Sequence, residues 1–213
     1  MVKTMILLCS AMLFACSKQS DTERDLLHLK ADQGDANAQF MLGATDPNGK
    51  GNSKDTAKTA EWFQRAALQG DADAQLMLGS MYEKGSGVPQ DSTKAIAWYK
   101  KAADQGDATA QYELGVAYAS GRGMPKDEAK AVEWLQKAAL QGDAPAQYEL
   151  GVMYAKGSGV PRDNVQAYGW INLAAISGNK DASELRDKME QTLTREQKAN
   201  GQKLSVKFLE KNP

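Results

Sequence analysis

The apolar residues of this 213-residue chain recur at intervals that predict short paired helices. In one representative stretch, Ala110, Leu114 and Tyr118 fall near one face of a first helix. A polar stretch, Gly121-Arg122-Gly123-Met124-Pro125, then interrupts the pattern, because the residue before a proline is disfavoured in the helical conformation. A second helix follows, so the stretch predicts a helix–turn–helix unit. The apolar side of this second helix contains Ala131, Trp134, Leu135, Ala138 and Ala139.

The unit recurs every 36 residues along most of the chain. Gly-Asp dipeptides, tryptophans and two further glycine columns all return at that interval, and the glycine columns together hold 17 of the 19 glycines. A period in this range is typical of solenoids, in which stacked units bury a continuous core. The periodic positions are Gly34, Gly70, Gly106 and Gly142 before Asp, with Gly178 before Asn; Trp62, Trp98, Trp134 and Trp170; Gly43, Gly79, Gly115 and Gly151; and the pairs Gly49/Gly51, Gly85/Gly87, Gly121/Gly123 and Gly157/Gly159.

Each periodic residue type has an expected structural role. The glycine of Gly-Asp suits the left-handed position that ends a helix, and the aspartate caps the next helix. Gly115 and its equivalents let a neighbouring helix approach closely, and the tryptophans are expected in the core rather than in a ligand-stacking ladder. A second aspartate column is expected to cap the second helices, and its members lie one repeat apart, too far for paired carboxylate chemistry. That column is Asp55, Asp91, Asp127 and Asp163.

Residues 70–106 carry the pattern G-D-A-x-A-Q-x-x-L-G-x-x-Y-x-x-G-x-G-V-P-x-D-x-x-K-A-x-x-W-x-x-K-A-A-x-Q-G. This pattern resembles the Sel-one-like repeat family, which is related to tetratricopeptide repeats. The resemblance implies an all-α, right-handed α-solenoid of helix–turn–helix repeats with capping helices at both ends. The expected organisation is a signal peptide at 1–15, a tether and cap helix at 16–33, repeats at 34–69, 70–105, 106–141 and 142–177, and capping helices at 178–213.

The two ends of the array are expected to differ from its middle, as is usual for capping units. In the first repeat, Asp46-Pro47 and Asn52-Ser53 replace residues of the pattern, so its first helix is expected to end early. The helix before it is expected to pack through Leu26, Leu27 and Leu29. After a helix over 179–192, Thr194 and Gln197 have capping-box spacing for a final helix. That final helix carries Leu204, Val206, Phe208 and Leu209.

Composition supports a helical protein and narrows its chemistry. Alanine and leucine total 51 residues against 12 for valine and isoleucine, which disfavours a β-sheet. Charge is nearly balanced at 26 basic and 27 acidic residues, so a nucleic-acid partner is not expected. The single histidine, His28, is expected to be a surface or packed imidazole, and no metal site or cofactor is expected.

The N-terminal residues predict export rather than a transmembrane helix. Lys3 precedes an apolar run from Met5 to Phe14, which is shorter than the ~20 residues that span a bilayer. The run ends Leu13-Phe14-Ala15-Cys16, which resembles the lipobox of bacterial lipoprotein signal peptides. The resemblance implies that Cys16 is lipidated and that the protein faces the periplasm, most simply from the outer membrane because Ser17 follows. The alternative is ordinary secretion with Cys16 as a free thiol.

No catalytic motif stands out in the sequence, and no catalytic residues are expected. It contains no G-x-S-x-G, no H-E-x-x-H, no C-x-x-C and no phosphate-binding loop of the Walker type. Some cysteine-rich relatives of the family have been described as β-lactamase-like, but this chain lacks their paired cysteines. A hydrolase is therefore the weakest of three hypotheses.

Solenoids of this kind use an extended concave surface to bind other proteins or peptides. The resemblance places one apolar column of the first helices toward that side, and its alternative role is packing between adjacent first helices. Columns that vary between units are candidates for specificity: Asp73, Thr109 and Pro145, and Met77, Glu113 and Glu149. The leading hypothesis is a non-catalytic adaptor of the cell envelope, and the second is an immunity protein against a toxic effector. The candidate binding residues are Phe40, Leu76, Tyr112 and Tyr148, with Asp73 and Glu113 beside them.

Overall fold

The computed structural model describes residues 23, 25–44 and 53–211, and these residues form helices joined by turns and loops, without a β-strand. A helical segment over 25–32 precedes the array. The first helices of successive units are α2 (Ala36–Ala44), α4 (Ala72–Lys84), α6 (Ala108–Ser120), α8 (Ala144–Lys156) and α10 (Lys180–Thr192). The second helices are α3 (Ser53–Leu68), α5 (Ser92–Asp104), α7 (Glu128–Leu140), α9 (Asn164–Ile176) and α11 (Arg195–Lys211).

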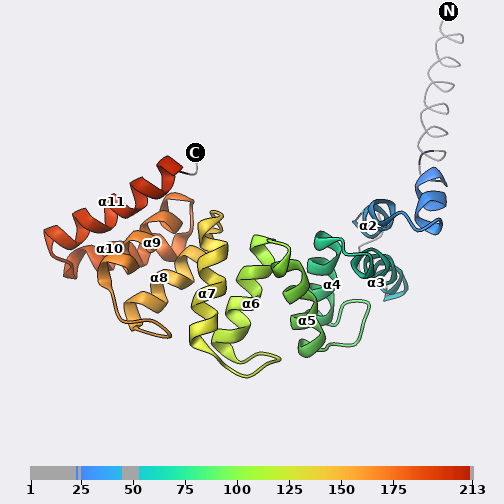
Figure 1. Ribbon diagram of the computed structural model, residues 1–213, viewed down its shortest axis with the longest axis horizontal. Coiled ribbons are helices and arrows are strands. Elements are labelled where there is room, and N and C mark those ends of the chain that lie inside the picture. Colours follow the sequence, from blue (N-terminus) through green and yellow to red (C-terminus); the bar gives the residue numbers. More distant parts are fainter. Residues whose placement is uncertain (1–22, 24, 45–52, 212–213) are drawn as a thin grey trace, which may run out of the picture.

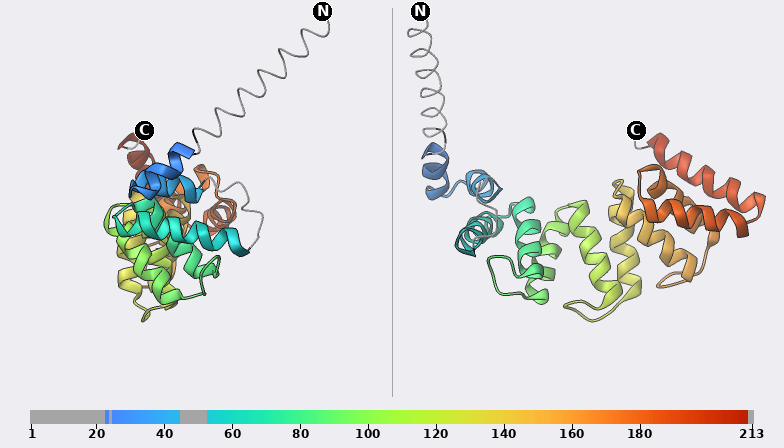
Figure 2. Two further views of the ribbon diagram at one scale, coloured as in Figure 1. Left: turned by 90° about the vertical axis from the view of Figure 1, so that its right-hand side faces the viewer. Right: turned by 180° about the vertical axis from the view of Figure 1, so that it is seen from behind.

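The helices follow one another along an arc, with the 25–32 segment at one end and α11 at the other (Figure 1). The same succession is visible from behind in Figure 2. The most extensive contacts join helices that are consecutive in the sequence, and the exception is the pairing of α9 with α11. This is an α-solenoid, as the 36-residue period predicts.

Several sequence predictions lie outside the described residues. They concern the signal peptide, Cys16 and the polar tether after it, and the atypical loop of the first repeat at residues 45–52. The structure therefore neither supports nor opposes them.

The predicted helix caps are confirmed except at Asp55, which lies inside α3 because that helix already begins at Ser53. Asp107 accepts a hydrogen bond from the Ala110 N–H of α6 at 2.7 Å, and Asp127 accepts one from the Lys130 N–H of α7 at 3.0 Å. Gly106 has φ +100°, a left-handed conformation that other residues rarely adopt. These aspartates satisfy backbone donors that the first turn of a helix leaves without partners.

Close approach of helices explains the glycine column in the first helices. A Cβ on Gly115 would lie 2.7 Å from Leu135 Cγ, so α6 and α7 could not keep their present separation with a larger residue there. The second glycine of each described loop pair, Gly87, Gly123 and Gly159, has a role that the sequence analysis missed. A Cβ on Gly123 would lie 2.6 Å from the Ser92 carbonyl oxygen, because this loop packs on the first turn of α5 in the preceding unit.

A ladder of glutamine side chains joins successive units. Within the ladder, Gln141 donates through Nε2 to Gln111 Oε1 at 2.8 Å, and Gln111 donates to the Ala103 carbonyl at 3.2 Å. The same pattern links Gln105 to Gln75 and Gln69 to Gln39. It ends at residue 177, which is a serine, and Gln147, only 1% exposed, keeps an Oε1 atom without a hydrogen-bond partner.

The N-terminal cap differs from its prediction. Leu27 packs against a core cluster that the array forms at this end, but Leu26 and Leu29 are 51% and 54% exposed. The cluster consists of Ala31, Ala38, Leu42 and Trp62. Residues four apart share a helix face, so Leu27 and Ala31 point inward together, whereas Leu26 and Leu29 lie about 100° and 200° around the helix from Leu27. The expectation that all three leucines pack was therefore wrong. His28 lies beside Trp62, with 6.4 Å between the ring centroids, and is the packed imidazole that the sequence allowed.

The C-terminal cap forms as predicted at its start. Thr194 N–H donates to Gln197 Oε1 at 3.0 Å, and Gln197 N–H donates to Thr194 Oγ1 at 3.2 Å, which is the predicted capping box. The contact of α11 with α9 depends on Gly201 and Ser205, which are buried. Phe208 also packs there, whereas the other apolar side chains of α11 are exposed: Leu204, Val206 and Leu209.

Candidate functional site

The predicted apolar column of the first helices is half-buried along the array. Each member contacts the core that the following helices form, so the column contributes to packing between units and keeps part of its surface exposed. The Phe40 ring lies 5.6 Å from that of Phe63, measured between centroids. The others are Leu76 against the α5–α6 core, Tyr112 against the α7–α8 core and Tyr148 against the α9–α10 core. Of the two polar candidates, Asp73 is exposed and Glu113 is half-buried.

Glu113 belongs to a charged cluster that the sequence analysis missed. Arg122, in the loop after α6, forms ion pairs with Glu113 of α6 at 3.1 Å and with Glu83 at the end of α4. Tyr99 of α5 donates its hydroxyl to Glu83 Oε2 at 2.7 Å. The signal was present in the sequence, since Arg122 stands between two glycines where neighbouring repeats have Ser86 and Ser158.

Burial controls the ionisation of this charged cluster. It raises the pKa of Glu113, the negative charge of Glu83 adds to the effect, and Arg122 opposes it. The pKa of Tyr99 is raised as well, by burial and by its hydrogen bond to Glu83. One arginine between two half-buried carboxylates compensates part of the cost of removing those carboxylates from water.

A pocket of about 250 Å³ lies one unit further along the same face, between α6 and α8. Tyr112 forms part of its wall, and Glu149 contributes the one ionisable carboxylate that lines it. Burial raises the pKa of Glu149, while the positive charge of Lys156 opposes that rise. No described residue, Lys156 included, forms a hydrogen bond or ion pair with this carboxylate. The pocket is lined by Tyr112, Val116, Ala119, Ser120, Leu135, Glu149 and Met153.

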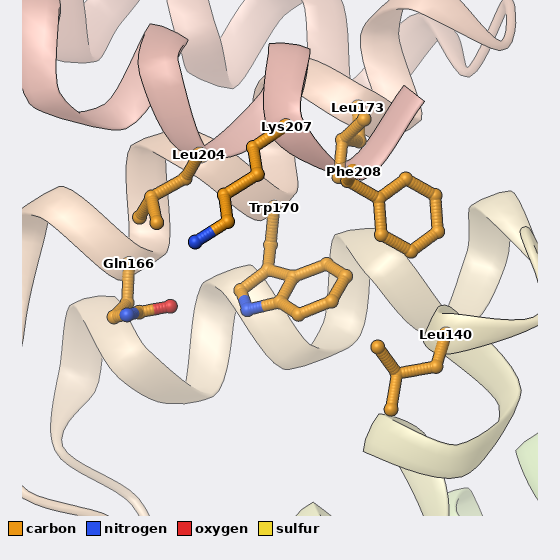
Figure 3. Close-up of a pocket in the computed structure, with 8 residues that line it drawn as sticks. Leu140, Gln166, Trp170, Leu173, Leu204, Lys207 and Phe208 are labelled. Carbon is orange, nitrogen blue, oxygen red and sulfur yellow. The ribbon is translucent and has the colours of Figure 1, made fainter. Parts of the chain in front are cut away.

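A second pocket, of about 210 Å³, lies between α9 and α11 and is mostly apolar. Figure 3 shows Trp170 between Lys207 and Phe208 of α11 and Leu140 of α7. The Trp170 and Phe208 rings make an edge-on contact, with 5.8 Å between centroids. This pocket is where the final helix closes the end of the array.

The tryptophan column is less buried than predicted. Trp62 is buried, but Trp98, Trp134 and Trp170 are half-buried. Lys101 and Lys137 lie over the rings of Trp98 and Trp134, at 3.9 and 3.8 Å from the ring centroids. These tryptophans pack against the core with one side and carry a lysine on the other, so the expectation of a plain core column needs that correction.

The described residues offer little for catalysis or metal binding. No group of three or more His, Cys, Asp or Glu side chains among them is arranged to hold a metal ion. Asp91 and Asp127 accept backbone hydrogen bonds that lower their pKa values, so these carboxylates act as helix caps. None of the helices in the described ranges is long and apolar enough to cross a membrane.

The fold and this face define a class: an α-solenoid of helix–turn–helix repeats, which presents side chains of successive first helices on one surface. Comparison with known protein families agrees with this class. The Sel1 repeat matches the chain four times, at residues 36–71, 72–107, 108–143 and 144–179. The chain belongs to the Sel1 repeat family. Proteins of this family are generally protein-interaction scaffolds and are typically non-catalytic. No curated protein matches the chain.

Solved structures of Sel1 repeat proteins resemble the chain. It is 35% identical to c5321, a protective antigen present in uropathogenic Escherichia coli strains, with a TM-score of 0.56. That match covers 88% of this chain and 48% of c5321, so the chain spans about half the length of that relative. A Sel1 repeat protein from Oxalobacter formigenes is 30% identical, with a TM-score of 0.70, over 82% of this chain and 74% of its own. Cysteine-rich protein B of Helicobacter pylori, 24% identical with a TM-score of 0.50, shares the fold over 65% of this chain and 99% of its own.

Proposed function

We propose that this protein is a non-catalytic adaptor of a bacterial cell envelope that binds a partner protein on the face of its first helices. The observation that carries the proposal is the half-buried column that includes Leu76, Tyr112 and Tyr148. Aromatic side chains that remain partly exposed beside apolar neighbours are the usual anchors of protein interfaces. The variable neighbours Asp73 and Glu113 would then tune which partner is accepted.

Site-specific photo-crosslinking tests which face binds. A photoreactive residue replaces Thr109 or Pro145, which are exposed on the first helices within one turn of Tyr112 and Tyr148. Matched controls replace the exposed residues Ala97 and Gln136 on the second helices. We expect one distinct adduct from both first-helix positions in cells that express the protein, and none from the controls. Equal labelling from both faces, or labelling from the second helices alone, contradicts the proposal.

The envelope location of this adaptor rests on the sequence of the N-terminus. The Leu13-Phe14-Ala15-Cys16 segment supports lipidation of Cys16, and Ser17 supports sorting to the outer membrane in a cell with two membranes. Several acyl chains together give stable attachment where one chain gives only marginal binding. We expect labelled palmitate in the wild-type protein and none in Cys16→Ala. A wild-type protein that stays unlabelled and soluble contradicts this part of the proposal.

A further inference from the structure

The exposed surface formed by the first helices, here called the first-helix face, contains two equivalent sites one repeat apart. The two sites have the same backbone conformation and different side chains. Helices α6 and α8 each have 13 residues, and the loops after them have matching glycine conformations, with φ +78° and +69° in one and +75° and +70° in the other. The 36-residue period therefore superposes Glu149 on Glu113 and Ser158 on Arg122. The side chains that fill the site around Glu113 therefore indicate what kind of group would fit the site around Glu149.

The first site is filled by the chain itself. Arg122 reaches between Glu113 and Glu83, and Tyr99 completes the cluster through its bond to Glu83. In the second site, one repeat later, the equivalents are smaller or apolar: Ser158 for Arg122, Ala119 for Glu83 and Leu135 for Tyr99. Ala119 and Leu135 line the 250 Å³ pocket, so the pocket lies where the preceding unit holds its arginine cluster.

Of the four cluster positions, only that of Glu113 has the same residue type one repeat later, where it is Glu149. Its carboxylate is half-buried, lines the pocket and lacks the ion pair that Arg122 gives to Glu113. A carboxylate removed from water without a paired charge is unfavourable, and a cation entering the pocket would relieve that cost. Apart from Ser120, whose hydroxyl donates to the Val116 carbonyl, the remaining walls are apolar or aromatic, and they would cover the carbon chain of such a side chain.

At about 250 Å³ the pocket is smaller than the roughly 300–1,000 Å³ of pockets that hold drug-sized ligands, which suits a small group such as one side chain. We propose that it binds an arginine side chain of the partner protein, with the guanidinium paired to Glu149 and lying against Tyr112. Arginine suits the site better than lysine, because a planar guanidinium pairs with carboxylates through two bonds and stacks on aromatic rings. This inference rests on the proposed function and names the feature of the partner that the first-helix face recognises.

A short peptide tests the inference without knowledge of the partner. The probe is acetyl-Ala-Arg-Ala-amide, titrated into the full chain while the Glu149 carboxyl signal is followed by NMR. We expect saturable binding in the millimolar range, as befits one buried side chain, and a lowered pKa of Glu149 in the complex. The peptide with citrulline in place of arginine keeps the shape and loses the charge, and should bind at least tenfold more weakly. The lysine peptide should bind several-fold more weakly.

Three variants complete the test. Glu149→Gln should weaken binding of the arginine peptide at least tenfold, whereas the control Glu133→Gln, at an exposed position of α7 outside the pocket, should change it less than twofold. Ser158→Arg should place an arginine where Arg122 lies one unit earlier, occupy the pocket from within and abolish peptide binding. Retained helicity in each variant confirms that folding is not the cause.

The inference is overturned if the citrulline peptide binds as well as the arginine peptide, or if Glu149→Gln binds normally. Absence of saturation by the arginine peptide at tens of millimolar also overturns it. Crosslinks from Thr109 and Pro145 would then still support the proposed function. If those crosslinks are absent and the arginine peptide still binds, the proposed function is contradicted and the arginine pocket is not.

Discussion

Gly169 of α9 and Gly201 of α11 face each other so closely that a Cβ on Gly169 would lie 3.3 Å from the Gly201 carbonyl oxygen. A Cβ on Gly201 would lie 2.7 Å from the ring of Tyr168, and Ser205 donates its hydroxyl to the Gly169 carbonyl at 2.9 Å. These two glycines are the ones outside the 36-residue columns. The end of the array therefore uses a helix contact that the repeats themselves do not contain.

Gly201→Val should loosen this contact. The added side chain meets Tyr168 and the backbone of α9, so we expect a loss of about 1–3 kcal/mol in the free energy of unfolding, as is typical of overpacking. The measurement is a urea melt followed by circular dichroism. Ala199→Val, at an exposed position of the same helix, is the control for placing a β-branched residue in α11. Equal melts for the two variants would show that α11 contributes little to stability.

Ser177→Gln should extend the glutamine ladder by one rung. Ser177 has φ −74° and ψ 5°, close to the backbone of Gln105 and Gln141, so a glutamine there can donate to Gln147 Oε1. A hydrogen bond of this kind contributes about 0.5–1.5 kcal/mol, and we expect a gain of that size in a urea melt. The reverse change, Gln141→Ser, should destabilise the protein. A Ser177→Gln protein no more stable than wild type would show that the Gln147 acceptor is already satisfied by water.

Glu149 should make the protein less stable as pH rises. Burial raises the pKa of Glu149 in the folded protein, so the folded state holds a proton that the unfolded state has lost above about pH 4.3. The free energy of unfolding therefore falls as pH increases from that value through the raised native pKa. Lys156 on the same helix limits the effect, and Tyr112 faces the carboxylate from α6.

Glu149→Gln removes this titrating group. We expect a higher Tm than wild type at pH 7 and a smaller decline in Tm between pH 4 and 7. Glu133→Gln, at an exposed position of α7, is the control and should leave the pH profile unchanged. If Glu149→Gln kept the full decline, the pH dependence would have to come from other groups, of which Glu113 is the first candidate.

Asp107→Ala should weaken the start of α6. The variant leaves the Ala110 N–H without the 2.7 Å bond to the aspartate, and loss of such a cap costs about 0.5–2 kcal/mol. Asp107→Asn keeps an acceptor oxygen and should lose much less in the same thermal melt. Similar losses in the two variants would mean that the charge of Asp107, rather than its hydrogen bond, stabilises the helix.

The repeat period was enough to predict the solenoid, because glycine, aspartate and proline impose local backbone conformations that do not depend on distant residues. Asp107 and Gly106 are examples, and both behave as predicted. The exposed Leu26 and Leu29 were missed because, among the described residues, this first helical segment has neighbours on one side only. The apolar pattern shows which residues can be buried, but not how much cover the fold provides.

The pocket beside Glu149 was beyond prediction from the pattern alone. Glu149 stood out as a residue of a variable column, but its isolation depends on Ala119, Leu135 and Ser158, which come from three other segments. Each of those substitutions is ordinary when read singly. The cavity arises because they coincide at one interface, and only the packing of α6, α7 and α8 brings them together.

The glutamine ladder also affects how the repeat array can lengthen by duplication of whole units. Each rung joins two glutamines of one repeat, such as Gln111 and Gln141, and the first of them also donates to a carbonyl of the preceding unit. A duplicate of residues 106–141 would therefore carry its own complete rung. A duplicate of residues 142–177 has Ser177 at the donor position and would repeat the unmatched Gln147 acceptor. We therefore expect a duplicate of the third repeat to be tolerated better than a duplicate of the fourth. Longer descendants of this chain should differ by whole internal units while retaining the same closing helices.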